Sequence, residues 1–120
     1  MAEHNDLGRA GEELAVAELK KMGYEILYTN WRFGNDEVDI IAKESDMIVF
    51  AEVKTRQTNF FGEPETFVNK KKQLFLIRAA NKYAEKFDIY NEFRFDIVSV
   101  LFNSKQQDVK VIKDAFQAGM

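Results

Sequence analysis

Two apolar segments separated by a short polar turn constrain this chain more than any other feature. Val38–Ala42 and Met47–Val53 are rich in valine, isoleucine and phenylalanine, and the polar residues Lys43–Asp46 lie between them. This composition favours β-strands, so we predict a hairpin. Side chains alternate across a strand, and Glu52 and Lys54 would therefore lie on one face at the end of the second strand.

Asp39 interrupts the first strand of this hairpin, where an apolar residue is expected. Asp39 from one strand, with Glu52 and Lys54 from its neighbour, could place two carboxylates and one ammonium group around a common point. Mg²⁺ prefers oxygen ligands and often takes one or two protein carboxylates, keeping waters for a phosphate substrate. A lysine beside the metal could orient an attacking water or stabilise charge on phosphorus. In the structural alternative, Asp39 pairs with Lys54 or Lys43, and Glu52 lies at a solvated strand end.

Length and composition limit the classes of protein that need consideration. A chain of 120 residues with 46% hydrophobic and 31% charged residues is typical of one globular domain. We expect a single domain over residues 1–120, with a core of about residues 6–113 and short flexible termini. The chain has no cysteine and only one histidine, His4, which argues against disulfides, thiol catalysis and histidine-based metal sites.

The net charge of −3 counts against binding of nucleic acid by bulk electrostatics, although a local basic patch remains compatible with it. No apolar run approaches the roughly 20 residues of a membrane span, and no signal peptide is visible. The expected location is the cytoplasm.

Apolar periodicity predicts elements in the order α-β-β-β-α-β-β, which indicates a mixed sheet flanked by helices. Asp6 is a candidate N-cap, Gly23 a candidate C-terminal stop, and residues 1–5 and 115–120 are expected to be irregular ends. The predicted helices are Asp6–Met22 and Lys70–Phe87, and the predicted strands are Tyr24–Asn30, Asp36–Lys43, Met47–Val53, Phe93–Phe102 and Val109–Ile112.

The charged side chains on the two predicted helices can be interpreted either as part of a site or as solvated surface groups. Glu12 or Glu18 could project from the first helix toward a site at the sheet edge, or both could be solvated. The second helix begins with Lys70, Lys71 and Lys72. Such a run is usually solvated, but cations at a helix N-terminus oppose the helix dipole, which is easier to understand if an anion docks there.

Five short elements occur in one order and together carry a family resemblance. They are G-R-x-G-E at Gly8–Glu12, N-W-R at Asn30–Arg32, D-E-V-D at Asp36–Asp39, E-V-K-T-R at Glu52–Arg56 and R-F-D at Arg94–Asp96. The chain resembles the YraN-like uncharacterised protein family, small bacterial proteins with a restriction-endonuclease-like fold related to archaeal Holliday-junction resolvases. The resemblance runs from about Gly8 to Val100, and E-V-K-T-R is its most specific part.

The resemblance implies a restriction-endonuclease-like α/β fold and a role for each matching residue. Asp39 and Glu52 match metal-binding carboxylates, and Lys54 matches the catalytic lysine. Glu12 matches an acid near the metal, directly or through water, and is preferred to Glu18. All three positions of the central motif are intact.

Basic residues would contact the substrate if the family function holds. Lys72 matches a basic position at the start of the family's second helix, and Arg56 matches the arginine after the strand. The proline often found before that helix is Asn69 or Lys70 here. We expect phosphate contacts from Arg56, Lys70, Lys71 and Lys72. Arg32 could also contact the substrate, although its neighbourhood is compatible with packing alone.

The expected function is a Mg²⁺- or Mn²⁺-dependent endonuclease acting on structured or branched DNA. A second copy of the chain is a candidate partner, and no membrane partner is expected. The alternative is a non-catalytic nucleic-acid-binding or protein-interaction module on a nuclease scaffold. A third interpretation is a structural partner in a larger assembly that uses the aromatic segment Phe60–Phe67 as its contact.

Overall fold

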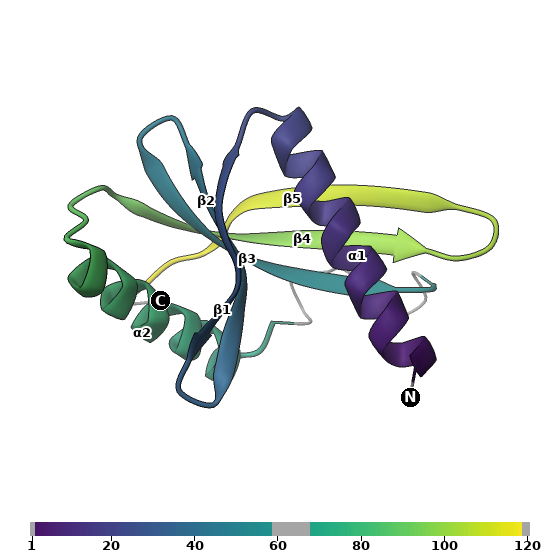
Figure 1. Cartoon of the computed structure of the whole chain (residues 1–120), viewed down its shortest axis with the longest axis horizontal. Coiled ribbons are helices and arrows are strands. Elements are labelled where there is room, and N and C mark those ends of the chain that lie inside the picture. The colour runs from purple at the N-terminus through teal and green to yellow at the C-terminus, as the bar shows by residue number, and fades with distance from the viewer. Residues whose placement is uncertain (1, 59–67, 119–120) are drawn as a thin grey trace.

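The computed structural model describes residues 2–58 and 68–118, and for residues 2–5 it describes the backbone alone. It confirms the expected α/β fold and its element order (Figure 1). The predicted contact segment Phe60–Phe67 lies outside the described residues. The elements are α1 (Ala2–Lys21), β1 (Glu25–Phe33), β2 (Asp36–Glu44), β3 (Met47–Arg56), α2 (Lys70–Phe87), β4 (Phe93–Phe102) and β5 (Gln107–Phe116).

The strands form one mixed sheet in the order β1-β2-β3-β4-β5. Neighbouring strands are antiparallel except β3 and β4, which run parallel. A parallel pair needs a long crossover, and the chain between β3 and β4 contains α2, whereas the antiparallel neighbours are joined by short turns. β5 lies at an edge of the sheet.

Each helix packs on its own face of the sheet. Ala15 and Leu19 of α1 are fully buried in a cluster with Val49 and other strand residues of one face. The opposite face carries a second cluster, in which Leu76 of α2 packs with Phe50. Figure 1 shows α1 crossing in front of the sheet and α2 at the lower left, well separated from α1. Alternate residues of β3 therefore face different helices, and the face that continues from Phe50 to Glu52 is the one that α2 covers.

Several predicted boundaries were wrong. α1 begins at Ala2, so Asp6 lies inside the helix and is not its N-cap; nothing in the sequence of residues 2–5 breaks a helix. β1, β3 and β5 are longer than predicted because pairing with neighbours extends them beyond the local apolar runs, as in the Phe33–Asp36 pair. The stop at Gly23 is confirmed: its φ of 98° places it in the left-handed region.

A buried ionic network fixes the beginning of β4. Asp96 is fully buried, and its carboxylate accepts hydrogen bonds from Arg94 Nε at 2.9 Å and from the Tyr24 hydroxyl at 2.9 Å. Arg94 also pairs with Glu44 at 2.8 Å. Arg94 and Asp96 thus neutralise each other, and the R-F-D element has a structural role.

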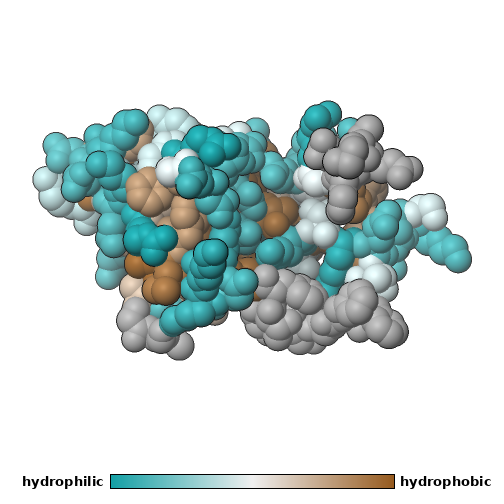
Figure 2. Space-filling model, turned by 90° about the horizontal axis from the view of Figure 1, so that it is seen from below, coloured by the Kyte–Doolittle hydropathy of each residue, from teal (hydrophilic) through white to brown (hydrophobic). Residues whose placement is uncertain are grey.

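The surface is mainly hydrophilic, with hydrophobic side chains showing between polar ones on the face in Figure 2. Large hydrophobic residues that are exposed include Leu74, Phe87 and Tyr90. Within the described ranges, no helix is long and apolar enough to cross a membrane.

Candidate functional site

The candidate site lies where β2 and β3 stop pairing. Their antiparallel ladder ends at the Ile40–Ala51 pair. Beyond it, the backbone N–H of Val53 donates a 2.8 Å hydrogen bond to Asp39 Oδ2. The Asp39 side chain thus takes the place of a backbone acceptor, which holds its carboxylate between the two strands.

Asp39 and Glu52 are a pair of carboxyl groups close enough for each to affect the pKa of the other. Glu52 is only 6% exposed, so it does not lie at a solvated strand end. Burial raises the pKa of both groups, and the Asp39 charge raises the pKa of Glu52 further. Among the described residues, Glu52 Oε1 has no hydrogen-bond partner. The pair therefore favours a bound proton or a neutralising cation.

Two lysines approach Glu52 from different elements. Lys54 Nζ lies 3.8 Å from Glu52 Oε2. The structural alternative paired Asp39 with Lys54 or Lys43, but the carboxylate that Lys54 pairs with is Glu52. Lys72 Nζ reaches over from α2 to within 3.7 Å of Glu52 Oε1 and 3.0 Å of Asp36 Oδ2. The Lys54 side chain is 35% exposed and that of Lys72 is 19% exposed, so Lys54 is the ammonium group more accessible to a substrate.

Glu12 is hydrogen-bonded to β1 and does not join the carboxylate pair. Its Oε1 accepts a 3.0 Å hydrogen bond from Asn30 Nδ2, and its charge contributes to the raised pKa of Asp39. Asn30 has a left-handed backbone with φ of 52°. In the part of the chain that the structure describes, no three His, Cys, Asp or Glu side chains gather into a group that could hold a metal ion. Asp39 and Glu52 are thus the two carboxyl groups that the fold itself brings together.

The basic residues expected to bind nucleic acid are distributed around the site. Lys70 and Lys71 are exposed at the start of α2, and Arg56 is half-buried at the end of β3. Arg32 pairs with Glu37 at 3.6 Å. Asn69 caps α2 by accepting a 2.9 Å hydrogen bond from the Lys72 N–H.

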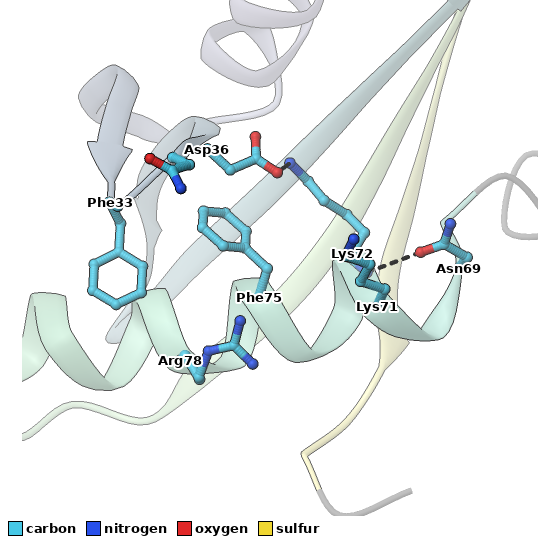
Figure 3. Close-up of a pocket in the computed structure, with 9 residues that line it drawn as sticks. Phe33, Asp36, Asn69, Lys71, Lys72, Phe75 and Arg78 are labelled. Atoms are coloured by element: carbon cyan, nitrogen blue, oxygen red, sulfur yellow. Dashed lines mark hydrogen bonds and ion pairs between the residues drawn. The ribbon is translucent and has the colours of Figure 1, made fainter.

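Sequence reasoning missed a cleft beside the carboxylate pair. The cleft has a volume of about 630 Å³ and lies between the β1–β2 turn and the start of α2 (Figure 3). The sequence of α2 did contain a pattern that indicates one wall of this cleft. A lysine, a phenylalanine and an arginine follow one another at steps of four and three residues, which places them on one side of the helix. Residues lining the cleft include Phe33, Asp36, Lys71, Lys72, Phe75 and Arg78.

Comparisons with known proteins all identify one family, and the matched relatives cover almost the whole chain. The model of the uncharacterised protein family UPF0102 matches residues 11–100. A UPF0102 protein of Flavobacterium psychrophilum is 47% identical over 116 residues, covering 97% of this chain and 98% of the relative. A UPF0102 protein of Caldicellulosiruptor saccharolyticus is 48% identical over 114 residues, covering 92% and 97%. A UPF0102 protein of Bacteroides thetaiotaomicron is 44% identical over 116 residues, covering 97% and 96%.

Proposed function

The chain belongs to the uncharacterised protein family UPF0102, the YraN family, and on this premise we propose that it is a metal-dependent endonuclease acting on structured or branched DNA. The observation that carries the proposal is the placing of Asp39 and Glu52, two electrostatically coupled carboxyl groups, just beyond the end of the β2–β3 ladder. Two adjacent carboxyl groups with raised pKa values are unfavourable together in their ionised forms. A divalent cation would relieve that repulsion.

The residues present fit Mg²⁺ or Mn²⁺. These ions prefer oxygen ligands, and Mg²⁺ commonly binds one or two carboxylates while it keeps several waters. Asp39 and Glu52 would hold the ion, and the Glu52 oxygen that has no hydrogen-bond partner among the described residues is a ready ligand. Glu12 would act directly or through a water. When bound, the ion lowers the pKa of a water and stabilises charge on a phosphoryl group.

The lysines have separate tasks in this proposal. Lys54 is partly exposed beside Glu52, so its ammonium group can donate a hydrogen bond to an attacking water or to a phosphate oxygen. Lys72 is more buried and is held by Asp36, which suits a cation that offsets the charge of Glu52 and orients it. Both lysines favour an anionic substrate at the opening of the site.

Recognition would depend on the DNA backbone. Arg56, Lys70 and Lys71 would contact phosphates, with Arg32 at the margin. Phosphate contacts position a substrate without reading its sequence, so we propose selection by DNA structure rather than by sequence. Symmetric cutting of a four-way junction requires two active sites, so we further propose a homodimer, which size-exclusion chromatography with light scattering would detect.

The proposal is tested by cleavage of a panel of duplex, flap, single-stranded and four-way-junction DNA with Mg²⁺ or Mn²⁺. Wild type is compared with Lys54→Ala and Asp39→Asn. Matched controls are Lys20→Ala and Asp46→Asn, which alter exposed residues of the same types. We expect wild type and both controls to cleave at least one structure, and both site variants to lose about 100-fold or more in rate.

Two results would contradict the proposal. One is cleavage that survives both site substitutions, and the other is no cleavage of any substrate by a folded wild type. Binding of DNA without cleavage would favour the alternative, a nucleic-acid-binding module on a nuclease scaffold.

A further inference from the structure

The cleft between the β1–β2 turn and α2 combines aromatic walls with cations. Phe33 and Phe75 lie with ring centroids 5.9 Å apart, and Phe33 stacks on Trp31 with the ring planes parallel to within 1°. Figure 3 shows Phe33 directed from β1 toward α2, with Phe75 rising from the helix and Arg78 close to the helix below it. Phe75 is buried while Phe33 is only half-buried, so Phe33 is the ring that a ligand can still cover.

The charges of the cleft leave a net attraction for anions. Lys72 is already engaged by Asp36, the carboxylate that lines the cleft with it. Lys71 and Arg78 are exposed, and within the described ranges neither forms an ion pair. They lie two helical turns apart with Phe75 between them, so one stripe of α2 presents cation, ring and cation in order. This pattern suits a ligand with a flat ring and flanking phosphates.

We infer that this cleft binds one nucleotide of an unpaired strand, with its base against Phe33 and its phosphates beside Lys71 and Arg78. Bases stack on aromatic rings without regard to sequence, and basic side chains follow the backbone of the strand. A paired base presents its flat faces to its stacked neighbours, so a duplex interior could not use Phe33 in this way. The cleft would therefore select single-stranded segments.

The inference rests on the proposed function and supplies its substrate preference. Lys72 lines the cleft and also lies 3.7 Å from Glu52 Oε1, so the cleft and the carboxylate pair share a wall. A strand held in the cleft would pass next to Asp39 and Glu52. Cutting would then occur beside an unpaired nucleotide, as at a flap or the branch point of a junction.

The test measures binding in EDTA, where metal-dependent cleavage cannot occur. Fluorescence anisotropy compares a labelled oligothymidylate with a blunt duplex for wild type, Phe33→Leu and the double variant Lys71→Gln/Arg78→Gln. The matched controls are Phe87→Leu, which alters a partly exposed ring on α2, and Lys20→Gln/Lys110→Gln, which removes two exposed charges elsewhere. Phe33→Tyr keeps the ring and tests whether an aromatic side chain suffices.

We expect Phe33→Leu to weaken oligothymidylate binding about tenfold, and Phe33→Tyr to restore it. The double charge variant should weaken binding and reduce the slope of log affinity against log salt by about 1.4, because two single-strand phosphate contacts are lost. The controls should bind as wild type does. Duplex binding should change much less than oligothymidylate binding in the Phe33→Leu variant.

Unchanged oligothymidylate binding in both Phe33→Leu and the double charge variant would overturn the inference. So would equal losses in the matched controls, or binding of free thymidine monophosphate as tight as that of the oligonucleotide. If Phe33→Leu fails to fold, loss of oligothymidylate binding in Phe33→Tyr would also count against it. Binding in EDTA does not depend on metal-dependent cleavage, so a failure of the proposed cleavage and a failure of the cleft give different results.

Discussion

Gly11 on α1 packs directly against Thr55 on β3. A Cβ added to Gly11 would lie 1.8 Å from Thr55 Oγ1 and 2.8 Å from Thr55 Cβ, distances at which atoms overlap. The absence of a side chain at position 11 therefore lets α1 approach the end of β3. The next residue along the helix is Glu12, so this close approach helps to place the Glu12 carboxylate near the candidate site.

Gly11→Ala is expected to destabilise the protein by about 1–3 kcal/mol, because the helix must move away from β3. Gly8→Ala is the matched control on the same helix, since nothing lies within 4 Å of a Cβ at that position. Alanine has the higher helix propensity, so this control should gain up to about 1 kcal/mol. Urea denaturation measures both free energies of unfolding, and equal effects of the two substitutions would contradict the packing argument.

Glu52→Gln is expected to stabilise the metal-free protein at neutral pH by on the order of 1 kcal/mol. Burial and the Asp39 charge raise the pKa of Glu52 in the folded state. Between the ordinary pKa of a glutamate and this raised value, the folded state binds more protons than the unfolded state. Stability contributed by Glu52 is therefore present at low pH and is lost as pH rises through that window.

The measurement for Glu52→Gln is the free energy of unfolding at about pH 5 and at about pH 8. The difference in free energy of unfolding between Glu52→Gln and wild type should be small at the lower pH and larger at the higher pH. Glu25→Gln alters an exposed glutamate at the start of β1 and should have the same free energy of unfolding as wild type at both pH values. A difference that is independent of pH would show that Glu52 does not titrate as described.

Addition of Mn²⁺ or Mg²⁺ is expected to raise the melting temperature of wild type. A ligand that binds only the folded state at about 100 times its Kd stabilises by about 2.7 kcal/mol, which corresponds to a shift of several degrees. Asp39→Asn and Glu52→Gln should lose the shift, and Asp46→Asn should keep it. An equal shift in all four proteins would locate metal binding elsewhere.

Lys72→Met is expected to destabilise the metal-free protein at neutral pH by about 1–2 kcal/mol. It removes the ammonium group between Asp36 and Glu52 and leaves the Glu52 carboxylate beside Asp39 with less compensation. Its neighbour Lys71 is exposed, so Lys71→Met should change stability by less than about 0.5 kcal/mol. If the two substitutions had the same effect on urea denaturation, Lys72 would be an ordinary surface lysine.

The sequence predicted the fold well where local patterns and tertiary packing agree. The bounds Lys70–Phe87 and Phe93–Phe102 are those of α2 and β4, because the apolar periodicity of each segment matches the face it buries. The prediction failed at the first helix, where residues 2–5 continue α1 without an apolar pattern. It also fell short for β5, which extends to Phe116 through pairing with β4.

The site was predicted in part. Alternation along a strand places Glu52 and Lys54 on one face, and in the structure they are 3.8 Å apart. Nothing in the local pattern shows that β2 pairs with β3 only from Ile40 onward, which leaves Asp39 outside the ladder. The sequence also does not indicate that Lys72 lies near Glu52, because this contact depends on how α2 packs against the sheet.

The sequence by itself determined the element order, the family and the identity of the chemically suited side chains, since these follow from local periodicity and from motifs read in order. Only the tertiary structure decided the environment of those side chains. It buries Glu52 against Asp39, which raises the pKa of both, and brings Lys72 across from α2. It also forms the aromatic and cationic cleft from β1 and α2. The physical reason is that burial and electrostatic coupling depend on contacts between residues far apart in the chain.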